Sequence, residues 1–129
     1  MNRQELIQKL QALNFPKEDY WLVTGGAMVL YGIRDKTHDI DLGCSRKLAD
    51  HLEAKGFPEE RTADGRRKFL IASEIEVYEE WLFDCIENVE GIPVISCKGL
   101  IMMKESLGRE KDFADIALIR DFLKRMDCV

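Results

Sequence analysis

The sequence predicts a fold of the α/β or α+β class, in which helices flank a small mixed β-sheet. Apolar residues recur at helical spacing near both ends of the chain, short alternating or apolar runs lie between them, and glycine, proline and an Asp-Gly pair separate the segments. The predicted order is helix, strand, helix, strand, helix, several strands and two helices. A length of 129 residues fits one domain, so we expect residues 1–129 to form a single unit.

The first segment predicts an amphipathic helix. Asn2 is a suitable N-cap and Glu5 follows three residues later, which is the spacing of a capping box. The apolar residues that recur at helical spacing are Leu6, Ile7, Leu10 and Leu13. Phe15 and Pro16 end the helix, because the residue before a proline disfavours the helical conformation.

A strand, a buried helix and a loop follow. Residues 20–24 are mainly apolar, aromatic or β-branched and predict a strand, which Gly25 and Gly26 interrupt. Residues 27–33 are apolar nearly all round, so we expect a short buried helix there. Residues 34–38 are polar and predict a loop.

The central part of the chain predicts further strands. Residues 39–44 alternate strictly between two faces, which is typical of a half-buried strand. Ser45 can cap a helix that runs to Lys55, with Gly56 as its stop. The other predicted elements are strands over residues 60–63, 67–72, 74–80 and 92–96 and helices over residues 98–107 and 110–126. An Asp-Gly turn at 64–65 joins the first two of these strands as a hairpin.

The composition excludes several classes of protein. Hydrophobic residues make up 46% and charged residues 33%, which supports a core and argues against disorder. A net charge of −5 argues against broad nucleic-acid binding, although Arg66, Arg67 and Lys68 form a local basic run. The scattered cysteines, Cys44, Cys85, Cys97 and Cys128, contain no C-x-x-C pair, so we expect no structural zinc site. With a charged N-terminus and no apolar run of membrane-spanning length, we expect a reduced, cytoplasmic protein with no membrane association.

Asp39 and Asp41 are the strongest candidates for a functional site. Residues i and i+2 of a strand point to the same face, and a rise of about 3.3 Å per residue places these carboxylates about 7 Å apart. Two acids aimed at one point repel each other unless a cation lies between them, and Mg²⁺ suits such oxygen ligands. Alternatively, both acids only occupy the solvent face of an edge strand.

Gly25 and Gly26 lie where the predicted strand passes into a helix. Glycines at this point let a phosphate approach the backbone, and a helix N-terminus favours an anion. Taken alone, the pair is equally consistent with a tight turn. Together with Asp39 and Asp41, it predicts a phosphate cradle beside a metal cradle.

Residues 22–42, LVTGGAMVLYGIRDKTHDIDL, resemble the signature of the nucleotidyltransferase superfamily related to DNA polymerase β. In that signature a strand ends in Gly-Gly, a short helix follows, and the next strand carries D-x-D after an R-x-x-T-x-D lead. Arg34, Thr37 and Asp39 match the lead. The branch that it resembles includes minimal nucleotidyltransferases and abortive-infection nucleotidyltransferase toxins. The resemblance therefore implies a nucleotidyltransferase-like fold.

A second part of the resemblance lies near the C-terminus. The same branch often carries a lysine on one helix and R-x-K-D-x-x-D at the start of the next, and the matching residues are Lys104, Arg109, Lys111, Asp112 and Asp115. Lys104 lies within an apolar stripe, so it must extend to solvent or pair with an acid such as Asp112 or Asp115. Taken alone, the pair also fits a structural salt bridge that ties the last two helices together. The resemblance implies that Lys104 and Asp112 line the site, contacting phosphate or ordering the acids.

The resemblance also implies a third metal-directed carboxylate on a later strand. Glu76 fits best, because it lies opposite the inward-facing Ile75 and Val77, and Glu74 is an alternative two residues away. The family more often has Asp at this position, and glutamate is longer by one methylene. The alternative is that these glutamates belong to a solvated acidic face.

The function implied by the resemblance is transfer of a nucleoside monophosphate from a nucleoside triphosphate to an acceptor hydroxyl, dependent on Mg²⁺ or Mn²⁺. The expected metal ligands are Asp39, Asp41 and Glu76, the other catalytic residues Lys104 and Asp112, and the nucleotide-binding residues Gly25, Gly26, Arg34 and Thr37. The acceptor is open among protein, RNA and small molecule.

A different class of function is a catalytically weak or inactive protein that keeps the fold and acts through a protein partner, as toxin–antitoxin components do. The expected domain leaves little chain for an acceptor-binding region, so we expect a second subunit or a partner to complete the acceptor site. Neither the nucleotide nor the oligomeric state follows from the sequence.

Overall fold

The computed structural model describes residues 1–127. The helices in this range are α1 (Arg3–Leu13), α2 (Thr24–Tyr31), α3 (Arg46–Ala54), α4 (Cys97–Leu107) and α5 (Glu110–Asp127). The strands are β1 (Tyr20–Val23), β2 (Ile40–Cys44), β3 (Glu59–Arg61), β4 (Arg67–Ala72), β5 (Ile75–Glu79), β6 (Ile86–Val89) and β7 (Ile92–Ile95). The predicted mixed α/β class is confirmed.

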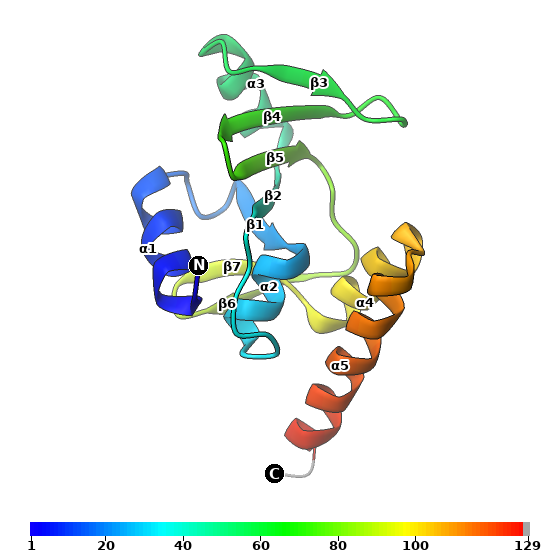
Figure 1. The fold of residues 1–129 in the computed structure, drawn as a ribbon. Coiled ribbons are helices and arrows are strands. Elements are labelled where there is room, and N and C mark those ends of the chain that lie inside the picture. Colours follow the sequence, from blue (N-terminus) through cyan, green and yellow to red (C-terminus); the bar gives the residue numbers. More distant parts are fainter. Residues whose placement is uncertain (128–129) are drawn as a thin grey trace.

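One sheet holds all of these strands in the order β3-β4-β5-β2-β1-β7-β6. The sheet is mixed, because β1 pairs antiparallel with β2 and parallel with β7, while β2 pairs parallel with β5. Figure 1 shows β3, β4 and β5 at one end of the molecule, α1 and α2 beside the central strands, and α4 packed against α5. The end of β1, where the chain passes into α2, and the helix pair α4–α5 therefore lie near the middle of the sheet.

The core explains the apolar residues of the two central strands, β1 and β2. All four residues of β1 are buried, and Ile40 and Leu42 of β2 have no exposed surface. Alternation then places Asp41 on the opposite face of β2, away from this core. The predicted caps also form: the Asn2–Glu5 capping box begins α1, and Ser45 accepts from the Leu48 amide at the start of α3.

One local prediction was wrong, and one strand was not predicted. The first strand ends at Val23 and α2 begins at Thr24, so Gly25 and Gly26 lie inside the first turn of the helix instead of before it. The edge strand β6 was not predicted, because its four residues are largely exposed and do not alternate between apolar and polar. The only signal for this strand in the sequence is Gly91, a turn residue before β7. In the structure, Glu90 and Gly91 of this turn both have positive φ angles, 52° and 81°.

The far half of α5 extends away from the sheet in Figure 1. Over residues 1–127, no helix combines the length and apolar character that crossing a lipid bilayer requires. Cys128, one of the four cysteines considered above, lies outside the described residues.

Candidate functional site

A cavity of about 380 Å³ opens where β1 passes into α2 and reaches across to α4 and α5. Of the nine residues predicted for the site, all except Gly26 line it: Gly25, Arg34, Thr37, Asp39, Asp41, Glu76, Lys104 and Asp112. Gly26 instead packs on the core, where an added Cβ would lie 2.9 Å from Leu22 Cδ1. The structure thus brings together residues that lie up to 87 positions apart in the sequence.

The predicted acid pair lies on the cavity side of β2. Asp41 is within the strand and pairs in register with Val23, while Asp39 is exposed and immediately precedes the strand. Thr24 donates a hydrogen bond from Oγ1 to Asp41 Oδ2 at 2.8 Å. Burial raises the pKa of Asp41, and this hydrogen bond partly opposes that effect. The charges of Glu76 and Asp39 raise the pKa further.

Glu76 lies beside Asp41 on the neighbouring parallel strand, in direct register with it. Its carboxylate is already engaged: Lys68 Nζ lies 2.6 Å from Glu76 Oε2, and the Tyr78 hydroxyl donates to the same oxygen at 3.4 Å. The hydrogen bond to Glu76 is the largest cause that raises the pKa of Lys68. Glu76 therefore faces the acid pair while its charge is balanced by a lysine.

Glu74 points elsewhere. Its carboxylate pairs with Lys9 of α1 at 2.7 Å and accepts a hydrogen bond from Ser73. These contacts, led by the hydrogen bond from Lys9, lower the pKa of Glu74 to about 2. Of the two glutamates considered for the third acid, only Glu76 lines the cavity.

The carboxylates of the cavity are the groups that could hold a divalent cation. Among residues 1–127, no three Asp, Glu, His or Cys side chains converge closely enough to hold a metal ion as they stand. Asp39 and Asp41 nevertheless supply two carboxylates on one side of the cavity, and Mg²⁺ is commonly held by one or two carboxylates together with substrate phosphates. The chemistry of this pair fits Mg²⁺ or Mn²⁺, and Glu76 lies beside Asp41 with one carboxylate oxygen, Oε2, paired with Lys68.

The opposite side of the cavity is an ion-pair network between α4, α5 and the loop after α2. Lys104 is 4% exposed, and its Nζ lies 3.0 Å from Asp115 and 3.6 Å from Asp112. Arg34 pairs with Asp115, and Arg109 donates to Asp112 at 2.6 Å and 3.1 Å. The predicted pairing of Lys104 is confirmed. Three cations face two carboxylates, which leaves this wall with a positive excess.

Asp112 also caps the start of α5. Besides the Arg109 guanidinium, it accepts from the Arg109 backbone amide at 3.1 Å, as a residue that caps the first turn of α5 does. The hydrogen bond from the Arg109 side chain is the main cause that lowers the pKa of Asp112. The spacing from Arg109 to Asp112 is therefore explained by helix capping together with charge pairing.

Arg34 also reaches the start of α2. A Cβ added to Gly25 would lie 3.1 Å from Arg34 Nη1 and 3.2 Å from Thr37 Oγ1. The missing side chain lets both polar groups approach the first turn of the helix, where free backbone amides attract anions. This side of the cavity is accordingly suited to bind phosphate.

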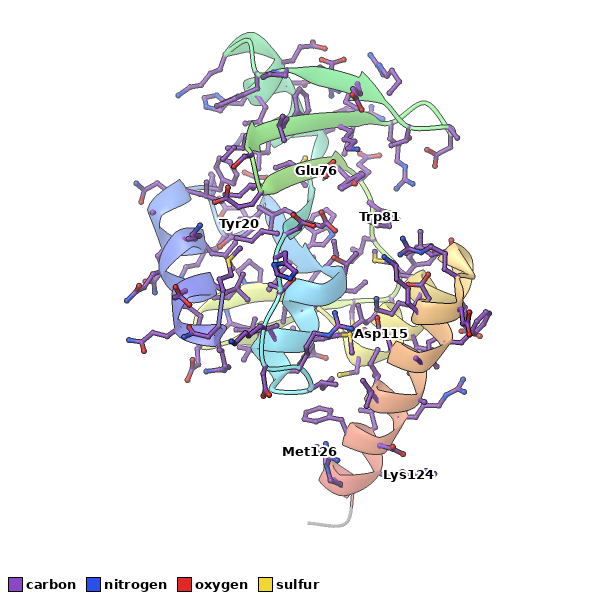
Figure 2. All side chains as sticks on the ribbon, in the orientation of Figure 1. Tyr20, Glu76, Trp81, Asp115, Lys124 and Met126 are labelled. Atoms are coloured by element: carbon purple, nitrogen blue, oxygen red, sulfur yellow. The ribbon has the colours of Figure 1, made fainter. Side chains whose placement is uncertain are left out.

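Tyr78 and Trp81 form an aromatic wall next to Glu76. Their ring centroids are 4.7 Å apart, and Lys68 and Arg66 lie over the Tyr78 and Trp81 rings at 5.5 Å and 5.9 Å. Burial, followed by the charges of Asp41 and Glu76, raises the pKa of Tyr78 to about 12. In Figure 2, Glu76 and Trp81 lie above Asp115, which comes from α5.

Sequence reasoning missed Thr24, Lys68 and Tyr78 as site residues. Tyr78 shares strand parity with Glu76, so its face could have been read from the sequence. Lys68 reaches Glu76 only because β4 pairs antiparallel with β5, with Lys68 opposite Tyr78, and that register has no local signal. For Thr24, the only signal in the sequence was its position directly before Gly25 and Gly26.

Comparison with solved structures shows the fold. The lincosamide antibiotic adenylyltransferase LnuA, in a lincomycin-bound crystal structure, aligns with a TM-score of 0.59 and 19% identity over 95% of this chain and 99% of its own. A protein of Thermotoga maritima assigned as a nucleotidyltransferase aligns with a TM-score of 0.63 and 17% identity over 97% and 96%. No family model and no curated protein matches the sequence. The chain has a nucleotidyltransferase fold.

Proposed function

We propose that this protein transfers a nucleoside monophosphate from a nucleoside triphosphate to an acceptor hydroxyl, with Mg²⁺ or Mn²⁺ as cofactor. One observation carries the proposal: an acid pair, Asp39 and Asp41, faces a cationic wall across a single cavity. A metal–triphosphate complex needs both, because its cation binds carboxylates and its phosphates bind basic groups and helix N-termini. The fold shared with nucleotidyltransferases supports the same chemistry.

Separate groups of residues hold the phosphates and keep the basic side chains in place. Arg34, Thr37 and the first turn of α2 at Gly25 hold the terminal phosphates, and Lys104 keeps the two aspartates of its network in place so that Arg34 and Arg109 stay at the cavity. A divalent cation held by Asp39 and Asp41 supplies charge neutralisation of the triphosphate. This arrangement positions the α-phosphate next to the acids.

The transfer replaces one bond at the α-phosphorus with another. The acceptor oxygen forms a bond to the α-phosphorus, the bond between that phosphorus and the bridging oxygen to the β-phosphate breaks, and pyrophosphate leaves. The hydroxyl proton passes to Glu76, which is the carboxylate beside Asp41 with room to accept it once Lys68 has turned away. Tyr78 and Trp81 offer aromatic faces on which a nucleobase can stack.

Three classes of acceptor carry a hydroxyl that can be tested. LnuA was crystallised with lincomycin, so a small hydroxylated molecule is the first class of acceptor to test. RNA and protein acceptors are the other two classes, and each is tested with labelled nucleotide by following transfer of the label.

A second candidate is a protein that binds nucleotide weakly or without turnover and acts through a protein partner. The Lys68–Glu76 pair favours it, because a neutralised third acid makes a poor base. Exposed apolar side chains on α5, Phe113 and Leu118 among them, offer a contact surface for a partner.

Calorimetric titration with a non-hydrolysable triphosphate tests the nucleotide site that the enzyme proposal requires, and transfer of label from a labelled triphosphate separates turnover from binding alone. We expect binding that requires Mg²⁺ or Mn²⁺ and that is lost in Asp41→Asn. Absence of metal-dependent binding for all four ribonucleotide analogues at millimolar concentration would discard the enzyme proposal in favour of the partner-binding one.

A further inference from the structure

Thr24 occupies an unusual backbone conformation. It is the first residue of α2 and has a φ angle of 54°, directly after the extended residue Val23. Left-handed φ values are uncommon outside glycine, and for a β-branched residue they are genuine outliers that surrounding structure must enforce. Such strained residues concentrate at functional sites.

The left-handed conformation is not placed on the glycines, which adopt it most easily. Gly25 and Gly26 follow immediately, yet neither is among the glycines with positive φ, which include Gly32 and Gly108. A glycine at position 24 would adopt this conformation without a steric penalty. The chain therefore has threonine at the strained position and glycine at the two unstrained ones beside it.

The Thr24 side chain explains this placement. Its hydroxyl donates to Asp41 Oδ2 at 2.8 Å, and within residues 1–127 it is the one hydrogen-bond donor to that carboxylate. The register of β1 with β2 sets Val23 opposite Asp41, so the turn at Thr24 begins just beyond the pair. Thr24 also lines the cavity and is half-buried.

We infer that Thr24 is a positioning residue: its strained backbone aims the hydroxyl at Asp41 Oδ2, which fixes the carboxylate and leaves Oδ1 to face the incoming cation. The inference rests on the proposed function, since it assigns Thr24 a role in the same site. Groups that orient a metal-binding carboxylate typically change metal affinity by about 10–100-fold when they are removed.

Three substitutions separate the hydroxyl from the backbone. Thr24→Ser keeps the hydroxyl, Thr24→Val keeps the branched shape without it, and Thr24→Gly removes both the hydroxyl and the steric strain. Thermal unfolding of the metal-free proteins tests the strain: Thr24→Gly should melt several degrees above Thr24→Val, although glycine normally destabilises a helix turn. A melting temperature for Thr24→Gly at or below that of Thr24→Val would show that no strain is stored.

Titration with Mn²⁺ and a non-hydrolysable triphosphate tests the positioning. We expect Thr24→Ser to bind like wild type, and Thr24→Val and Thr24→Gly to bind about 10–100-fold more weakly. Weaker binding in Thr24→Gly despite its higher stability is a result that a purely structural role would not give. Wild-type affinity in Thr24→Val, with binding lost in Asp41→Asn, would overturn the Thr24 inference alone. No Mn²⁺-dependent binding in the wild type would overturn the proposed function and the inference with it.

Discussion

The ammonium nitrogen of Lys68 lies 2.6 Å from a carboxylate oxygen of Glu76, and Glu76 pairs in register with Asp41 on the next strand. The lysine therefore balances one of the three acids on the strand side of the cavity, Asp39, Asp41 and Glu76. A divalent cation that approaches Asp39 and Asp41 meets this positive charge, so Lys68 and the cation compete for the same carboxylates.

Replacing Lys68 should strengthen metal binding. In Lys68→Met the competing charge is gone and Glu76 can join the other acids, so we expect Mn²⁺ to bind several-fold more tightly in the absence of nucleotide. The pair is about one-third exposed, so its loss should cost stability by no more than about 1 kcal/mol. Calorimetry with Mn²⁺ measures the first effect and thermal unfolding the second. Lys68→Arg, which keeps the charge, is the control, and equal Mn²⁺ affinity in Lys68→Met and Lys68→Arg would contradict the competition.

Asp41→Asn should remove metal binding and stabilise the metal-free protein. Burial and the neighbouring acids raise the pKa of Asp41 above its ordinary value of 3.8, so the native state binds this proton more tightly than the unfolded chain does. The stability contributed by this group is fully present below pH 3.8 and is lost as pH rises through the native pKa.

Asparagine carries no charge at any pH, so the variant should melt a few degrees above wild type at neutral pH and converge with it at acidic pH. Melting curves from pH 3 to pH 7 check this. A difference that grows toward low pH would have the wrong sign for a buried carboxylate.

Lys104→Met should destabilise the protein. The lysine is buried between Asp112 and Asp115, each of which retains one arginine after the substitution, so we expect a loss of about 2 kcal/mol. Urea unfolding measures it. Lys98→Met on the exposed side of the same helix is the matched control and should change stability by less than about 0.5 kcal/mol. Equal effects of the two substitutions would show that the Lys104 pairs contribute nothing.

Gly43→Ala should disturb the aromatic wall. An added Cβ would lie 2.0 Å from Trp21 Nε1 and 2.7 Å from the Trp81 carbonyl oxygen, and would break the hydrogen bond of 2.8 Å between these groups. We expect a loss of about 1–3 kcal/mol from overpacking and a shift in tryptophan fluorescence. Trp21→Phe removes the donor and leaves Trp81 as the one tryptophan, so the emission of this variant reports the environment of Trp81 alone. Adding Gly43→Ala to Trp21→Phe should shift that emission, and an unchanged spectrum would show that Trp81 is held by other contacts.

Local patterns predicted most of the elements because their causes are local. Asn2, Ser45 and the alternation around Asp41 act over a few residues, and the structure places each as expected. The pairing of Lys104 was also predictable, since a lysine in an apolar stripe requires an acid and two lay on the next helix.

The parts that were missed depend on contacts distant in sequence. The lysine beside Glu76 depends on how β4 pairs with β5, including a register shift after Leu70. The conformation of Thr24 depends on where Asp41 lies, 17 residues later. Strand β6 forms because β7 offers it an edge to pair with, whatever its own sequence favours.

Most of the cationic wall comes from a later stretch of the chain than the acids, and this sets an order of assembly during translation. Arg34, the acids and Lys68 lie in residues 34–76, whereas Lys104, Arg109 and Asp115 come later, on α4, on α5 and on the turn between them. A ribosome releases the chain from its N-terminus, so β1 to β5 can pair before α4 and α5 have emerged. During that interval Lys68 can already pair with Glu76, and the nascent chain has no complete cavity until the last helices dock.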